Sequence, residues 1–169
     1  AAACAFLSTP EYETKAGVLP PRLSDIASYN LGRSEAKLEE FKISDVYAVF
    51  KTNLLSASLK RSLFREIYLP TLPADEADRA QDKLWKEFNK TLTVKAPDIK
   101  NNPDFYEVTV THESPEQAAE WVNTYVAMAA KKTEEDMQDN VLTEIAAKGQ
   151  VFERQIDASR ITAQKRRED

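Results

Sequence analysis

The longest regular pattern of apolar and polar residues begins at Ser114 and continues to Asp169, and it predicts one long helix. Ser114 suits the N-cap, Pro115 suits the first helical position, and Gln117 can complete a capping box. No proline follows Pro115, and Gly149 is the one glycine in this stretch. About 55 residues at 1.5 Å each would extend roughly 80 Å, whereas an average helix has about 11–12 residues.

The apolar pattern changes along this predicted helix. The first part has a wide apolar face, typical of a helix on a domain core, formed by Ala118, Trp121, Val122, Tyr125, Val126 and Ala129. A charged stretch at 131–136 follows. Beyond it runs a narrower stripe at spacings of four and seven, which we call the seam: Met137, Val141, Ile145, Phe152 and Ile156. A narrow stripe of this kind is typical of a coiled coil, so we expect it to pair with another helix. The alternative is a solvated helix lengthened by its charges.

Three shorter stretches of the chain predict β-strands. Residues 92–96 and 105–111 alternate and predict an antiparallel hairpin, with 11–18 as a third strand. Between these stretches we expect short helices, with starts assigned to Ser24, to Ser44 or Asp45, to 56–58, and to Asp75 with Asp78. Residues 68–73 predict an extended connection, because the residue before each proline avoids the α region.

These elements predict an α+β fold with a small, mainly antiparallel sheet and one very long helix. We expect an α/β base domain at 1–113. The long helix at 114–169 should pack its first third on that base, and the remainder should project and end truncated. No stretch of about 20 apolar residues is present that would span a membrane.

Composition narrows the classes of function. The chain has 169 residues, a net charge of −5 and 42 % apolar residues, which favours a domain with a real core and argues against nucleic-acid binding. Cys4 is the single cysteine, so an internal disulfide is impossible. His112 is the single histidine, and a structural role is favoured over that of a base or ligand.

Chemistry-bearing motifs are missing from the sequence. It contains no GxSxG, Walker A or GxGxxG pattern, and three glycines could not build a phosphate cradle. We therefore predict no catalytic residues, no metal site and no cofactor. Aromatic residues that could stack on sugars are more often core residues at helical spacing; they are Tyr47, Trp85, Phe88, Trp121 and Tyr125.

Several motifs, in their order along the chain, resemble the periplasmic domain of Wzz-type chain length determinants, the bacterial polysaccharide co-polymerases. They are Phe6-Leu7-Ser8-Thr9-Pro10-Glu11-Tyr12-Glu13, Leu23-Ser24-Asp25-Ile26, Asp45-Val46-Tyr47-Ala48-Val49-Phe50 with Asn53-Leu54-Leu55-Ser56, and the strand 105–111 leading into Ser114-Pro115-Glu116-Gln117-Ala118-Ala119. Each motif is weak alone, and the resemblance covers nearly the whole chain.

The resemblance implies a regulator of O-antigen (lipopolysaccharide) chain length. Family members are anchored in the inner membrane by two transmembrane helices, which this sequence lacks, and face the periplasm. They assemble as homo-oligomers, act with the O-antigen polymerase and are not enzymes; the growing polysaccharide is a further candidate partner. The resemblance also implies returning helices that would pair with the long helix.

Other classes stay open on the sequence. One is the periplasmic domain of a related capsule or exopolysaccharide co-polymerase that carries a tyrosine kinase module. A second is a carbohydrate-active enzyme with a carboxylate pair, and a third is a cytoplasmic coiled-coil adaptor.

Overall fold

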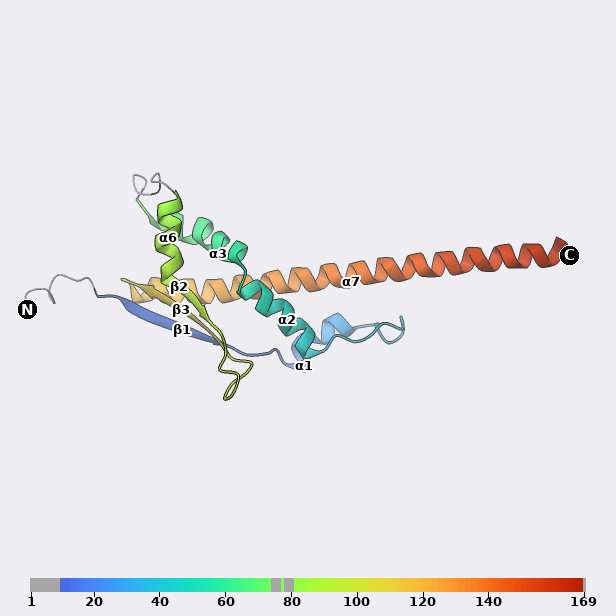
Figure 1. The fold of residues 1–169 in the computed structure, drawn as a ribbon, viewed down its shortest axis with the longest axis horizontal. Helices are drawn as coiled ribbons and strands as arrows, with labels where there is room; N and C mark the ends of the chain where they lie inside the picture. The colour runs from blue at the N-terminus through green and yellow to red at the C-terminus, as the bar shows by residue number, and fades with distance from the viewer. Residues whose placement is uncertain (1–9, 74–76, 78–80, 169) are drawn as a thin grey trace, which may run out of the picture. The chain divides into compact units, whose positions relative to one another are not determined.

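A computed structural model describes residues 10–73, 77 and 81–168 of the chain. It has a three-stranded antiparallel sheet and a long C-terminal helix, α7 (Pro115–Glu168), so the predicted α+β class is confirmed (Figure 1). The chain divides into two compact units, one ending at Thr133 and the other beginning at Glu134. Cys4, the motif at 6–9 and the expected helix start at Asp75 and Asp78 lie outside the described residues.

The sheet contains β1 (Tyr12–Val18), β2 (Leu92–Lys95) and β3 (Tyr106–His112), in the order β1-β3-β2. Both neighbours pair with β3 in antiparallel register, so the hairpin and the third strand occur as the alternation predicts. Val108 and Val110 of β3 are fully buried. Because side chains alternate along a strand, the residues between them face away from the core.

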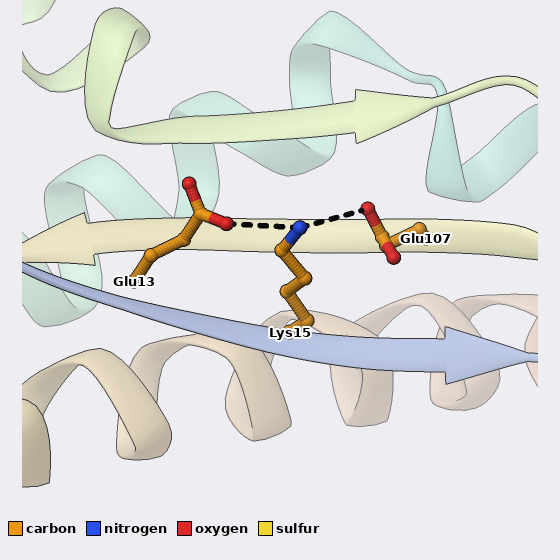
Figure 2. Close-up of polar contacts among 3 residues, drawn as sticks. All are labelled: Glu13, Lys15 and Glu107. Carbon is orange, nitrogen blue, oxygen red and sulfur yellow. Dashed lines mark ion pairs between the residues drawn. The ribbon is translucent and has the colours of Figure 1, made fainter.

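The outward face of the sheet carries charged side chains that bridge two strands. Lys15 Nζ lies 2.9 Å from Glu13 Oε1 and 3.5 Å from Glu107 Oε1, as Figure 2 shows. The hydrogen bond to Glu13 and the charge of Glu107 raise the pKa of Lys15. The pair with Glu107 joins β1 to β3, whereas Glu13 lies on the same strand as Lys15. Exposed ion pairs of this kind contribute little to stability.

Several helices connect β1 to β2. Side-chain hydrogen bonds at their first residues determine where they begin, and the sequence predicts some of these bonds. Helix α1 (Leu23–Ile26) continues into the 3₁₀ turn η2 (Ala27–Asn30), and α2 (Ile43–Leu54) precedes α3 (Ala57–Leu63). Ser56 caps α3, since its Oγ accepts hydrogen bonds from the backbone N–H groups of Ser58 and Leu59. This confirms the helix start predicted at 56–58.

The prediction that Ser24 caps the first helix is wrong. Helix α1 begins at Leu23, and the carboxylate of Asp25 accepts a 2.8 Å hydrogen bond from the N–H of Arg22. The start of α2 repeats this arrangement, with Asp45 accepting from Lys42 N–H at 2.8 Å. An acidic side chain at the third helical position therefore satisfies the N-terminal amide in both helices.

The extended connection predicted at 68–73 is also wrong over most of its length. A π-helical turn, η3 (Phe64–Tyr68), leads into the short helix α4 (Leu69–Thr71). Pro70 is tolerated because it lies in the first turn of α4, where a missing N–H costs little. Leu72 alone is extended before Pro73, with ψ of 147°.

One hydrophobic core joins the sheet to helices α3, α6 (Gln81–Thr91) and the first part of α7. Its buried members include Leu54, Leu63, Phe64, Leu84, Phe88, Leu92, Val108, Val110, Ala118, Trp121, Val122, Tyr125 and Ala129. Five of the six residues predicted to form the wide face of the long helix are thus fully buried, and Val126 packs against them.

Candidate interaction surface

The seam is placed on one face of α7 by helical geometry. At about 100° per residue, its five residues fall within an arc of about 100°. The arc is continuous because α7 has no break between Pro115 and Glu168. The unbroken helix therefore places Met137 and Ile156, which are nineteen positions apart, on the same stripe.

The structure gives the seam two environments. Met137 is 1 % exposed, and Val141 is half-buried. The three later members are exposed, with Ile145 at 54 %, Phe152 at 48 % and Ile156 at 52 % of their surface. Large apolar side chains exposed together on one helix face mark an interaction surface more often than a solvated one.

Polar and charged residues border the exposed part of the seam. Gln155, Ser159 and Arg160 line a shallow open hollow beside Phe152 and Ile156. Ser159 Oγ donates to the carbonyl oxygen of Gln155 at 2.8 Å, so its hydroxyl is already bonded. The Lys148 ammonium lies 5.6 Å from the centre of the Phe152 ring. This surface can pack against an apolar helix face.

Exposed apolar residues also occur on other faces of the same helix. Leu142 is 65 % exposed and Ile161 is 58 % exposed. Ile161 lies five residues after Ile156, which places it about 140° around the helix. The two isoleucines therefore have similar exposure, but only Ile156 belongs to the seam.

His112 is held by local contacts at the junction of β3 and α7. Its Nδ1 accepts a 2.9 Å hydrogen bond from the N–H of Ser114, and its ring lies edge-on to Trp121 at 4.7 Å between centroids. Ser114 Oγ accepts from Gln117 N–H, which is the predicted cap of the long helix. Within the described ranges, no three His, Cys, Asp or Glu side chains are grouped to hold a metal.

The five candidate sugar-stacking aromatics differ in where the structure places them. Phe88, Trp121 and Tyr125 are core residues, and Tyr47 is 3 % exposed with its hydroxyl donating to the carbonyl oxygen of Asp104. Trp85 differs, since it is half-buried and part of its ring lines a surface hollow. The sequence alone did not separate Trp85 from the other four.

Buried polar groups fasten the end of α2 to α7. Tyr125 Oη donates to the carbonyl oxygen of Leu54 at 2.7 Å, and Asn53 Nδ2 donates to Thr133 Oγ1 at 3.2 Å. Thr133 in turn donates to the carbonyl oxygen of Ala129 at 2.7 Å. Burial raises the pKa of Tyr125 to about 12, because the charged phenolate would be desolvated.

Replacing Tyr125 by phenylalanine should lower the free energy of unfolding at pH 8 by about 1–3 kcal/mol, since Leu54 would keep an unsatisfied buried carbonyl. The substitution should also change how the free energy of unfolding depends on pH under alkaline conditions. An unfolded tyrosine releases its proton near pH 10.0 and the folded Tyr125 near 12, so stability falls as pH rises through this window. That fall should be shallower in the variant.

Urea titrations followed by circular dichroism between pH 8 and 12 measure both effects. Tyr12→Phe is the control, because Tyr12 is 45 % exposed and its replacement should change stability at pH 8 by less than about 0.5 kcal/mol. A fall of equal steepness in the Tyr125 variant and the wild type would contradict the prediction.

Across the described residues, no helix is both long and apolar enough to cross a membrane. Comparison with protein-family models finds no match to this chain, and no curated protein matches it.

Proposed function

We propose that this chain is part of a regulator of O-antigen chain length that acts at the periplasmic face of the bacterial inner membrane. It would work as an oligomeric scaffold with the O-antigen polymerase, and no step of the reaction would fall to its own side chains. The observation that carries this proposal is the exposed apolar seam on α7, which suits pairing with another helix.

Two further observations support the proposal. The segment that resembles the Wzz-type family at 105–119 folds as β3 followed directly by the capped start of α7. The residues of the Asp45–Phe50 and Asn53–Ser56 motifs belong to α2 and to the cap of α3, beside the core. These motifs of the resemblance therefore lie on the central strand and on the helices around the core, which is compatible with a scaffold.

Deletion of the gene in its host, with O-antigen resolved by gel electrophoresis, is the direct test. Loss of the modal length distribution is expected, and an unchanged distribution would refute the function. A change confined to capsule or exopolysaccharide length would instead favour the related co-polymerase that carries a kinase module.

A matched pair of substitutions tests the seam within the full-length protein. Ile156→Glu should disperse the oligomer seen by chemical cross-linking and shift the modal length, because a carboxylate would enter an apolar helix interface. Ile161→Glu adds the same charge to a similarly exposed isoleucine outside the seam and should change neither. Equal effects of the two substitutions would show that the seam is not the interface.

A further inference from the structure

A small hollow lies between helices α3 and α6 on the first unit. It has a volume of about 160 Å³ and is lined by Arg61, Phe64, Arg65, Gln81, Asp82 and Trp85. The described residues of its wall supply two guanidinium groups, one carboxylate, one amide and the surface of two aromatic rings. This mixture differs from the apolar seam, and Phe64 also belongs to the core described above.

The two arginines are placed to act together. Arg61 and Arg65 are four residues apart in a continuous helical stretch, so they lie on the same face. The guanidinium carbon of Arg61 lies 4.8 Å from the centre of the Trp85 ring, which fixes the plane of its donors. No carboxylate of the described residues forms an ion pair with either arginine, so both retain donors for a ligand.

The backbone at this hollow is also unusual. Arg65 lies in the π-helical turn η3, where the N–H of Leu69 bonds to the carbonyl oxygen of Phe64. Isolated π turns are rare and occur frequently at functional sites. The Phe64 ring of the same turn packs edge-on against Trp85 at 5.4 Å, which ties this turn to α6.

We propose that this hollow binds the carboxylate of an acidic sugar residue in the polysaccharide. Arginine donors match the planar carboxylate and can bind it in a bidentate manner. Gln81 and Asp82 are exposed at the rim and can bond to sugar hydroxyl groups, while Phe64 and Trp85 supply an apolar wall. The volume suits one sugar unit better than a drug-sized ligand, for which pockets usually exceed about 300 Å³.

Two other interpretations fit the residues less well. A phosphate dianion would meet the carboxylate of Asp82 in the same small space, whereas a uronate carries one negative charge and several hydroxyl groups that Asp82 can accept. Arginine stems often cover an exposed aromatic ring without binding anything. That explains Arg61 over Trp85, but not Arg65, which is exposed and lines the same hollow.

The identity of the ligand as a polysaccharide residue rests on the proposed function, whereas the anion site itself rests on this geometry. Intrinsic fluorescence can report binding, because the chain has two tryptophans and Trp121 is buried. We expect tri-galacturonate to change the Trp85 emission saturably. Neutral galactose trisaccharide and inorganic phosphate should give much weaker responses.

The double variant Arg61→Gln with Arg65→Gln should bind tri-galacturonate at least about tenfold more weakly, as for lost hydrogen bonds to a charged group. The control is Lys83→Gln with Lys86→Gln, which removes equal charge from exposed positions of α6 and should bind as the wild type does. Arg65→Gln alone keeps the contact between Arg61 and Trp85 and should also weaken binding. This single variant replaces the double variant in the test if the fold of the double variant is disturbed.

Absence of a saturable response up to about 10 mM tri-galacturonate would overturn the proposal. So would equal affinity for the neutral sugar, tighter binding of phosphate, or equal losses in the arginine and lysine variants. Such failures would leave the role in O-antigen length intact if gene deletion still changed the modal distribution. Saturable binding without a deletion phenotype would support the anion site and refute the role in O-antigen length.

Discussion

Replacing Val110 by aspartate should prevent the chain from folding. Val110 lies on β3, the central strand of the sheet, with register partners Thr14 on β1 and Leu92 on β2, and it is 0 % exposed. The core cluster to which it belongs consists of hydrophobic side chains. An unpaired buried charge costs several kcal/mol, which is comparable with the 5–15 kcal/mol total stability of a typical domain.

Thr109→Asp is the matched control for this experiment. Thr109 is adjacent on the same strand but faces the outer side of the sheet, where its register partner on β1 is Lys15. An aspartate opposite a lysine on an exposed face should change stability by less than about 1 kcal/mol. Far-ultraviolet circular dichroism and urea titration of both variants measure the difference. Two variants of similar stability would show that the two faces of β3 are assigned incorrectly.

The sheet could be predicted from the sequence for a simple physical reason. Residues 106–111 alternate strictly, and a register shift of one residue would have exposed Val108 and Val110 while burying Glu107. The cap at Ser114 and the wide apolar face beyond it were equally local signals. Where the pattern and the burial requirement agreed, the element was predicted with nearly correct bounds.

The two wrong predictions, at 68–73 and at Ser24, have different physical origins. Pro70 suggested an extended segment, but Tyr68 and Leu69 pack against the core, and that burial outweighs the preference of the residue before a proline. Ser24 was assigned as a cap because of its residue type, although Asp25 provides the longer and charged acceptor. The first error therefore arose from tertiary packing, and the second from a competing side chain one residue away.

The candidate sites were predictable to different degrees. The seam could be read from spacing, but its burial at Met137 and exposure from Ile145 onward could not, because exposure depends on the rest of the fold. The hollow beside Trp85 was missed altogether. Arg61 and Arg65 show helical spacing in the sequence, yet Trp85 is 24 residues beyond Arg61 on another helix, so only the packing of α3 against α6 brings them together.

Replacing Trp121 by alanine should lower the free energy of unfolding by about 3–5 kcal/mol, the usual cost of removing a buried tryptophan. Trp121 is 1 % exposed, and its ring contacts three others: Tyr68 at 5.5 Å, Phe88 at 6.2 Å and His112 at 4.7 Å between centroids. These neighbours come from η3, α6 and β3. The side chain therefore joins three elements to α7, and the cavity cannot collapse by moving only one of them.

Trp85→Ala provides the comparison, since it removes an equal volume from a half-buried site. Trp85 contacts Phe64 at 5.4 Å and the Arg61 guanidinium at 4.8 Å, both beside the surface hollow. Solvent and the arginine stem can fill much of the vacated space, so the loss should be about half that of Trp121→Ala or less. Urea midpoints followed at 222 nm measure both losses independently of which tryptophan remains. If Trp85→Ala proved the more damaging, the centre of the core would lie at α3 and α6, and the start of α7 would be an addition to it.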